Sequence, residues 1–523
     1  MKRIISWFCV LAVLTGIFPV TLAAAAKAEA WDGSVDISWY DPEKDEYYLS
    51  TPAQLAGLAA LVNGMADPQA KTILGDPGYL QSIRVENVLL VGVGGGNVSD
   101  TVYTSNIDFS GKTVYLTADM DMGGRQDADG NWNGPNWTPI GGKFPMKPEE
   151  AEGDCMTLDT RFNGVLDGQG HCVSNLYCDR YAEKGFPYSM AVGLIGFLGG
   201  ACDNNEKITG EFENEWQPAV RNIKLASGYV YGRRMVGGIV GRVGETSHGV
   251  IIESCANAAT VRSTDSKGVG GICGSAWGSG CIRNCYNTGD IFTTYTCPAG
   301  GILGSNSGMD VYNCYNTGRV DTCSQQYGRG IGGHDSGTYT VNNCYYLEGC
   351  DDDPSSEGYY KGTSKKISVS CQSLTAEEIQ SSRFVDQLNA NGGVFTSDRK
   401  KINQGYPVLW FETEGPSSMT CIVAAETPEN GTITVSNSGE IALGETVVFS
   451  AQPAPGYLLE YYTVNGNPIP GNFYTVTQES RISAVFKKLR TVSIRWEDND
   501  AYYLAVRRSG WSYDDQGQML WVE

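Results

Sequence analysis

Two short patterns of apolar and small residues recur through the middle of the chain. One places a cysteine three residues after an aliphatic residue, at intervals of 30, 29 and 30 residues: Cys255, Cys285, Cys314 and Cys344. The other is Gly-Gly-Ile-x-Gly, which keeps phase with the first at Gly237, Gly270 and Gly300 and is degenerate at residues 330–333. A fixed period of this length indicates a solenoid, in which each unit buries its apolar face only against its neighbours.

Within each unit the apolar runs are short, rich in β-branched and aromatic residues, and separated by glycine or Asn-Thr-Gly. This pattern predicts strands joined by turns, which fits one coil of a parallel β-helix. The expected fold class is all-β, a right-handed parallel β-helix with helical caps followed by a small β-rich module. Stacked coils lie ~4.8 Å apart, which aligns Tyr286 with Tyr315 and Asn287 with Asn316. We expect these asparagines to be structural.

The β-helix is expected to span residues 31–412, with clear repeats over 222–347. Its ends need a cover, because an open coil is an unpaired strand edge. Residues 51–63 predict a helical cap, since Thr51, Pro52 and Gln54 suit its first turn. Thr375 and Glu378 make a second capping box, and residues 373–411 are expected to form the other capping region.

The C-terminal part of the chain has a different pattern. Residues 419–489 contain short alternating strands, such as 432–435, 446–450 and 482–486, separated by the turn signals Pro455-Gly456-Tyr457 and Val464-Asn465-Gly466. Residues 490–523 look like the start of a further β-module, which indicates a fragment of a longer protein.

Several segments resemble bacterial surface proteins that carry GLUG repeats. The resemblance rests on residues 48–59, 114–122, 137–141 and 162–171, and on the Gly-Gly-Ile-x-Gly and Asn-Cys-Tyr-Asn-Thr-Gly elements. It covers residues 31–412 and implies a secreted or surface-displayed β-helix associated with adhesion, without catalytic residues. Residues 444–447, 455–457 and 484–486 are similar to internalin B-repeat modules, which implies a stalk or spacer role for residues 419–489.

The first thirty residues are typical of a signal peptide. Lys2 and Arg3 precede an apolar run over residues 4–22, and alanine-rich A-x-A sites follow at 23–25 and 28–30. The alternative is an uncleaved membrane anchor. Cleavage after residue 30 would leave a chain that is secreted or held at the cell surface, with no further membrane span.

Charge and cysteine content restrict the function further. The chain has 59 acidic and 38 basic side chains, a net charge of −21, which argues against nucleic acid or anionic lipid as a partner. Fifteen of its 16 cysteines lie beyond the signal. We interpret the four periodic ones as a buried stack, with a disulfide between neighbouring rungs as the alternative. Cys172/Cys178 and Cys344/Cys350 are candidate local bridges.

Catalytic chemistry finds little support in the sequence. The three histidines, His171, His248 and His334, lack the context of pectin-hydrolysing β-helices, and serine-hydrolase, phosphate-loop and zinc-protease signatures are absent. Glycosidases use two carboxylates, and the candidates for such a pair are Asp119, Asp121 and Asp167. We therefore expect no catalytic residues and no organic cofactor.

One loop has the composition of a calcium site. Oxygen ligands alternate around a glycine at Asp127, Asp129, Asn131 and Asn133. This loop lacks the terminal glutamate of an EF-hand, and such runs are mostly plain turns. The neighbouring Trp132 and Trp137 are candidates for stacking on sugars, although Trp137 also fits a position inside a rung.

Together these observations predict a non-catalytic extracellular or surface-displayed repeat protein that acts in adhesion or binding. Its expected partner is a host or cell-wall glycan or a surface protein. Two alternatives stay open, a secreted carbohydrate-active enzyme built on the β-helix and a pure structural spacer. Release of sugar that vanishes in an Asp→Ala scan of residues 119, 121 and 167 would favour the enzyme.

Overall fold

The fold is taken from a computed structural model. It describes residues 30–67, 71–73, 101–102, 107, 109–145, 157–181, 190–200, 217–244, 249–264, 267–294, 297–323, 328–335, 337–351, 358–359, 368–390, 394–414, 420–442, 446–469, 471–476, 480–488, 510–513 and 519–522. The predicted signal peptide, apart from Ala30, and His248 lie outside these residues.

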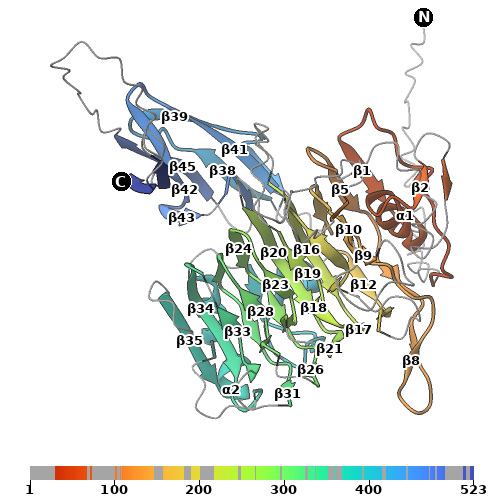
Figure 1. The fold of residues 1–523 in the computed structure, drawn as a ribbon. Coiled ribbons are helices and arrows are strands. Elements are labelled where there is room, and N and C mark those ends of the chain that lie inside the picture. The colour runs from red at the N-terminus through yellow and green to blue at the C-terminus, as the bar shows by residue number, and fades with distance from the viewer. Residues whose placement is uncertain are drawn as a thin grey trace, which may run out of the picture.

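Four sheets of mostly parallel strands run along the stack, and the coils between β11 and β33 contribute strands to all four (Figure 1). This arrangement confirms the predicted β-helix. The first sheet contains β1 (Glu46–Leu49), β5 (Thr113–Leu116), β6 (Met120–Asp121), β11 (Val165–Asp167), β12 (Cys172–Ser174), β16 (Ala219–Leu225), β20 (Val250–Asn257), β24 (Gly280–Arg283), β25 (Tyr286–Asn287), β29 (Met309–Tyr312), β30 (Tyr315–Asn316), β34 (Thr340–Leu347) and β35 (Ser368–Leu374). The second sheet contains β13 (Leu176–Asp179), β17 (Gly228–Gly232), β21 (Thr260–Ser263), β26 (Ile291–Thr293) and β31 (Val320–Thr322).

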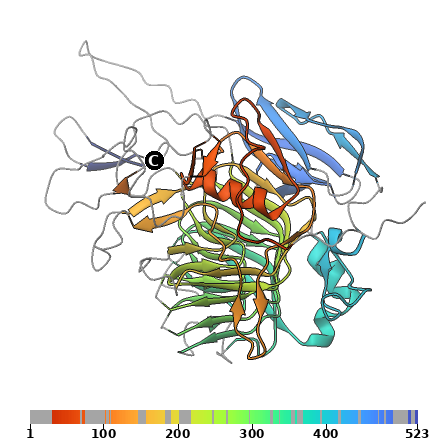
Figure 2. The same ribbon diagram turned by 90° about the vertical axis from the view of Figure 1, so that its right-hand side faces the viewer.

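The other two sheets complete each coil, and Figure 2 shows the rungs stacked on one another. The third sheet contains β4 (Thr101–Val102), β9 (Gly142–Pro145), β10 (Thr157–Thr160), β14 (Met190–Val192), β18 (Arg234–Gly237), β22 (Val269–Gly270), β27 (Ala299–Gly300) and β32 (Gly328–Arg329). The fourth sheet contains β15 (Ile195–Leu198), β19 (Val240–Val243), β23 (Cys273–Ala276), β28 (Leu303–Asn306) and β33 (Gly332–Asp335). The antiparallel pairs of β9 with β10 and β14 are the exception in the third sheet.

The periodic cysteines form a ladder in the core. Cys255, Cys285, Cys314 and Cys344 are fully buried, and the register of the flanking residues places them on successive rungs. Cys371 extends the ladder by one rung, opposite Cys344. Their sulfur atoms lie close to backbone carbonyls of neighbouring rungs, as Cys285 Sγ does to Ile252 O at 3.7 Å. The cysteines therefore act as small apolar core residues, as the sequence predicts.

Cys172, Cys178, Cys344 and Cys350 are free thiols, so the two candidate local bridges are wrong. Cys178 on β13 points into the core of the stack. Cys172 on β12 faces away from the core but is still partly covered, and this burial raises the pKa of its thiol to about 11. Cys344 belongs to the cysteine ladder. Cys350 instead lies at the end of the asparagine ladder, its sulfur 3.4 Å from Asn316 Nδ2. Cys172 and Cys178 thus point to opposite sides of the coil wall, and Cys344 and Cys350 belong to different ladders.

The two repeated sequence patterns contact each other: the asparagine two residues after a ladder cysteine packs against the second glycine of a Gly-Gly-Ile element. Asn257 Nδ2 donates to Asn287 Oδ1, and Asn287 Nδ2 donates to Asn316 Oδ1, each over 2.7 Å, which confirms the predicted ladder. The second glycine of each Gly-Gly-Ile element lies directly against this ladder. A Cβ at Gly271 would be 2.3 Å from Asn287 Cγ, and one at Gly301 would be 2.3 Å from Asn316 Cγ. The two motifs recur together because each rung needs both.

A second asparagine ladder marks a corner in the first sheet. The residue before each ladder cysteine has a left-handed backbone, with φ of 51° at Ser254, 55° at Asn284, 50° at Asn313 and 53° at Asn343. Asparagine tolerates this conformation better than most residues. The amides also bond between rungs, since Asn343 Nδ2 donates to Asn313 Oδ1 over 2.8 Å.

The N-terminal cap forms as predicted. Helix α1 (Pro52–Val62) begins after Thr51, whose side chain accepts from Gln54 N over 3.3 Å. It ends at Asn63, and Gly64 then adopts a φ of +67°. The helix is buried on nearly all sides and lies at the N-terminal end of the stack, beside β1 and β5 (Figure 1).

Residues 374–414, here called the lateral segment, lie along the side of the stack. They contain α2 (Ala376–Ile379), α3 (Ser382–Asn389), β36 (Phe395–Thr396), β37 (Val408–Leu409) and α4 (Trp410–Glu414). Their apolar side chains pack on outward-facing residues of the first sheet, namely Ala256, Tyr286, Tyr315 and Tyr345. The rings of Tyr286 and Tyr315 stack 5.1 Å apart, which confirms the predicted tyrosine ladder. The segment thus covers this flank over several rungs, where a cover across the last coil was expected.

The predicted C-terminal module folds separately from the stack. One of its sheets contains β38 (Thr420–Ala425), β40 (Gly439–Ala442), β42 (Tyr457–Val464), β43 (Asn467–Ile469) and β45 (Ser480–Lys488), and the other contains β39 (Gly431–Val435), β41 (Thr446–Pro453) and β44 (Phe473–Thr475). Beyond it the structure describes a hairpin of β46 (Gly510–Tyr513) and β47 (Met519–Val522). The start of a further module in 490–523 stays a prediction.

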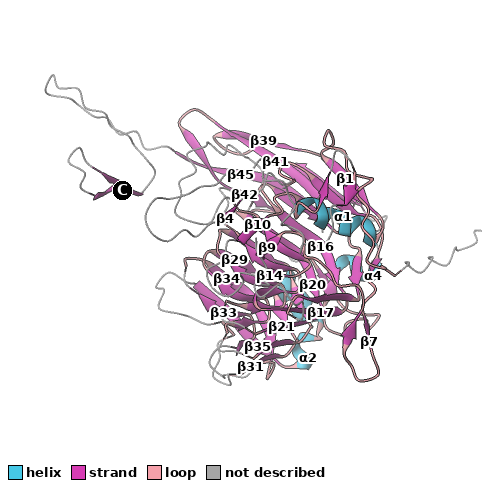
Figure 3. Cartoon of the chain, turned by 45° about the vertical axis from the view of Figure 1, so that its right-hand side comes forward, coloured by secondary structure: helices cyan, strands magenta, loops and turns pink. Residues whose placement is uncertain are grey.

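The module contacts the first sheet chiefly around the aromatic side chain of Phe473, with Gly471 beside Gln217 and Ile251. The ring of Phe473 lies over the guanidinium groups of Arg221 and Arg283, with centroid distances of 5.0 and 5.5 Å. It also packs with Ala219, Ile251 and other apolar residues of that face. Figure 3 shows the module beside the strands of the stack. The module is thus docked on the β-helix.

Replacing Phe473 by Ala is expected to weaken this docking by about 3 kcal/mol, because the ring is almost fully buried. The module and the β-helix should each stay folded while their relative position varies. Small-angle X-ray scattering would then show a larger radius of gyration. Ile422→Ala, at an exposed site of the same module, is the control, and unchanged scattering in the Phe473 variant would contradict the docking.

Candidate ligand-binding face

The three candidate catalytic aspartates are held by separate structural partners. Asp119 Oδ1 lies 3.1 Å from His171 Nδ1 and accepts from Cys172 N over 2.9 Å. The hydrogen bond from His171 lowers the pKa of Asp119. Asp167 is buried and accepts from Arg221 Nε over 2.8 Å, and that arginine in turn contacts Phe473 of the module.

Asp121 faces outward beside Asp119, as the alternation of the strand predicts. Its two oxygens bind the guanidinium of Arg125 at 2.9 and 2.8 Å. Burial raises its pKa, but the hydrogen bonds from Arg125 and Asn175 outweigh this effect and lower it overall. The carboxylate therefore orients the start of the hairpin that follows it.

The candidate calcium loop is the exposed turn of that hairpin, between β7 (Arg125–Gln126) and β8 (Trp132–Asn133). Asp127 Oδ1 accepts from the backbone of Asp129 and of Asn131, each over 2.9 Å, and the Asn131 amide lies 3.3 Å from Oδ2. Asp127 thus stabilises its own turn. Among the described residues no group of three or more His, Cys, Asp or Glu side chains is placed to hold a metal. Calcium binding by Asp127, Asp129, Asn131 and Asn133 stays a prediction.

The two tryptophans near this turn have different environments. Trp137 is buried, and its Nε1 donates to Leu194 O over 3.1 Å, which confirms its place inside a rung. Trp132 is half-buried on the projecting hairpin. Only Trp132 of the two has an accessible face for a ligand.

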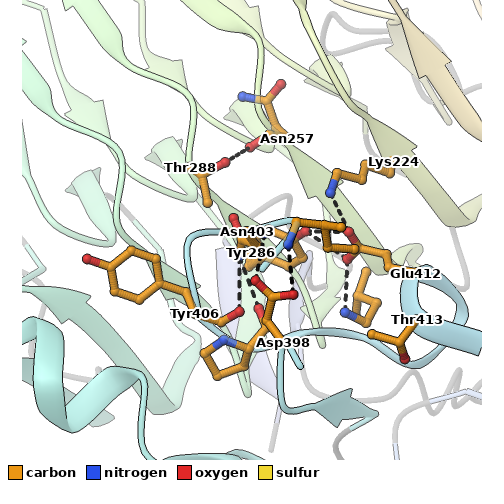
Figure 4. Close-up of polar contacts among 12 residues, drawn as sticks. Lys224, Asn257, Tyr286, Thr288, Asp398, Asn403, Tyr406, Glu412 and Thr413 are labelled. Atoms are coloured by element: carbon orange, nitrogen blue, oxygen red, sulfur yellow. Dashed lines mark hydrogen bonds and ion pairs between the residues drawn. The ribbon is translucent and has the colours of Figure 1, made fainter. Parts of the chain in front are cut away.

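A buried polar cluster joins the lateral segment to the stack (Figure 4). The carboxylate of Glu412 is paired with Lys224, accepts from Tyr286 OH at 2.7 and 2.9 Å, and accepts from Leu409 N over 2.9 Å. Burial raises the pKa of Tyr286 well above its usual range, so its hydroxyl remains a donor. Asp398 similarly accepts backbone hydrogen bonds from its own loop, as from Asn403 N at 2.7 Å. All of these groups are used in fastening the segment.

The second sheet carries its aromatic side chains where solvent reaches them. Its inward residues, such as Val230 and Val261, are fully buried. On its outer side Tyr229 and Tyr231 are half-buried, and Tyr181 just beyond β13 is 53% exposed. By contrast, Tyr286, Tyr315 and Tyr345 on the outer side of the first sheet are covered by the lateral segment, although Tyr48 of the same sheet is 58% exposed and stacks on Tyr115.

These rings form one group together with a cation, here called the aromatic face (Tyr177, Tyr181, Tyr229, Tyr231, Arg262 and Phe292). The Tyr231 ring lies 4.9 Å from that of Tyr181 and 5.8 Å from that of Tyr229. The guanidinium of Arg262 is 5.2 Å from the Tyr231 centroid. Burial raises the pKa of Tyr229, and Arg262 opposes that shift. Rings on a rigid sheet with hydroxyls at their edges can stack on a sugar and hydrogen-bond to it.

The sequence analysis does not identify this face. The alternation in Gly228-Tyr229-Val230-Tyr231 reads as an ordinary half-buried strand. A signal was nonetheless present, because Tyr177 and Tyr229 occupy equivalent outward positions on successive rungs and Tyr231 follows on the same face of β17. Recognising it requires knowing which sheet the lateral segment covers.

Comparison with known proteins assigns the module. Residues 422–490 match the family model of a divergent InlB B-repeat domain, which confirms the resemblance stated for that region. No curated protein matches the chain. A solved structure described as a "putative immunoglobulin A1 protease" from Bacteroides ovatus has a TM-score of 0.35 and 20% identity, covering 60% of this chain and 93% of that one. That similarity is too low to assign a fold or a function. Among the described residues no helix is long and apolar enough to cross a membrane.

Proposed function

We propose that the chain is a non-catalytic extracellular or cell-surface protein of the GLUG-repeat type that binds glycans through the aromatic face. One observation carries the proposal: several aromatic rings and a guanidinium gather on the second sheet where solvent reaches them, whereas Tyr286, Tyr315 and Tyr345 of the first sheet are covered by the lateral segment. A bacterial repeat domain at residues 422–490 and the absence of a spanning helix among the described residues are compatible with this location.

The parallel sheet suits a binding role because it presents side chains at a regular spacing. Rungs lie ~4.8 Å apart, close to the length of one sugar residue, so an extended chain can lie across several rungs. Stacking on one aromatic ring contributes about 1 kcal/mol beyond area burial. The rings of neighbouring rungs, Tyr177 beside Tyr229 in one row and Tyr231 and Phe292 on either side of Arg262 in the next, can therefore hold an oligosaccharide of moderate affinity without any moving part.

Replacing Tyr231 by Ala is expected to reduce glycan binding about tenfold or more, because its ring contacts both Tyr181 and Tyr229. Binding of the purified chain would be measured on a glycan array and then by calorimetry with the best ligand. Tyr461→Ala, at an exposed tyrosine of the module, is the matched control.

Three results would redirect the proposal. Equal binding by both tyrosine variants would place the ligand elsewhere. Reducing ends released from a polysaccharide, and lost in Asp→Ala variants at 119, 121 or 167, would favour the carbohydrate-active enzyme. If the purified chain bound no glycan and no surface protein, the structural spacer would be the function that remains.

A further inference from the structure

Arg262 stands at the centre of the aromatic face. The register of the second sheet aligns one residue from each rung in a row: Asp179, Tyr231, Arg262, Phe292 and Asp321. Arg262 thus has an aromatic residue on the rung before it and on the rung after it. The two acidic residues of the row stand two rungs away, roughly 10 Å in each direction at the usual strand spacing.

The polar groups of Arg262 are incompletely used. Its guanidinium stacks on Tyr231 and hydrogen-bonds to the side chain of Tyr229, and within the described part of the chain its Nε has no hydrogen-bond partner. No carboxylate among the described residues forms an ion pair with it. The Nε itself is enclosed, so a ligand acceptor would meet the terminal nitrogens of this half-buried guanidinium.

The flanking acids are engaged with other groups. Asp179 Oδ1 accepts from Tyr181 N over 3.0 Å, and Asp321 Oδ2 pairs with Arg319 at 2.8 Å. At physiological salt the screening length is about 8 Å, so charges farther away on this acidic protein contribute little at Arg262. The local environment therefore presents an accessible cation between aromatic rings.

We propose that the aromatic face selects an acidic saccharide, a uronic or sialic acid unit, whose carboxylate binds Arg262. This inference rests on the proposed glycan-binding function and names its ligand class. The sugar ring stacks on Tyr231 or Phe292, and the carboxylate takes the fork of donors that a guanidinium offers. A neutral sugar would make the same stacking contact and leave the Arg262 donor unpaired.

The test compares ligands that differ only in charge. Oligogalacturonate and its methyl ester form one pair, and sialyllactose and the methyl ester of its sialic acid form the other. In calorimetry with the purified chain, the acidic member of at least one pair is expected to bind about tenfold tighter or more, since a hydrogen bond to a charged group contributes about 1.5–3 kcal/mol. Preference for the neutral member, or equal affinity, in both pairs would overturn the inference.

Variants at Arg262 separate this inference from the proposed function. Arg262→Gln should abolish the preference for the acid while retaining binding of the neutral ligand, and Arg262→Lys should restore part of the preference. Arg481→Gln, at an exposed arginine of the module, is the charge-matched control. Retained preference in the Gln variant would overturn the role of Arg262. Absence of binding to either member of each pair, with wild-type circular dichroism, would instead overturn the glycan-binding function.

Discussion

Gly271→Ala is expected to lower the free energy of unfolding by about 3 kcal/mol, because no space exists for a methyl group there. Its Cβ would lie 2.3 Å from both Asn287 Cγ and Gly301 O. Neither neighbour can move freely, since the Asn287 amide bonds to Gly289 O and Asn316 Oδ1 and the carbonyl belongs to the next rung. Urea unfolding followed by circular dichroism measures the change.

A second glycine in the same stack gives the matched control. Gly308 also has a negative φ, and the nearest atom to its Cβ would be Gly278 O at 3.3 Å. Gly308→Ala should change stability by less than about 1 kcal/mol. If Gly271→Ala and Gly308→Ala lowered the free energy of unfolding by the same small amount, the close packing of the asparagine ladder against the Gly-Gly-Ile elements would be wrong.

Glu253→Ala is expected to cost about 3–5 kcal/mol, because it leaves the buried guanidinium of Arg283 without its counterion. Glu253 lies between Arg221 and Arg283 in the register of the first sheet. Its carboxylate binds Arg283, with Nε–Oε1 of 2.8 Å and Nη2–Oε2 of 3.0 Å, and both residues are almost completely buried. Phe473 covers the same arginine, so the module should also be loosened. Thermal and urea unfolding measure the loss.

An exposed pair tests whether burial is the cause. Glu426 and Arg481 lie 3.2 Å apart with side chains 46% and 73% exposed, and Glu426→Ala should cost no more than about 1 kcal/mol. The double variant Glu253→Leu, Arg283→Met should recover much of the loss, because no charge is left unpaired. Equal costs for Glu253→Ala and Glu426→Ala would contradict a buried ion ladder.

The period of the sequence predicts much of this fold. Because each coil repeats the same interior positions, Cys255 to Cys344 and Asn287 to Asn316 align once the period is known. The helical cap at α1 follows from local chemistry at Thr51, Pro52 and Gln54. What the pattern does not show is the contact of Gly271 with Asn287, since that needs the path of the chain around one coil.

The candidate site was less accessible to sequence reasoning. The aspartates of the 127–133 loop attract attention through composition, yet Asp127 serves its own turn. The aromatic face depends on which flank is covered, and that is decided by contacts far apart in the chain, such as Tyr286 with Glu412. Strand alternation alone gives Tyr286 and Tyr231 the same outward orientation. Only the docking of the lateral segment distinguishes them.

The most direct test is a crystal structure of the chain with a bound acidic oligosaccharide. We predict sugar density on the second sheet, with a ring stacked on Tyr231 or Phe292 and a carboxylate at Arg262. Density at another part of the molecule, with the aromatic face empty, would contradict the account.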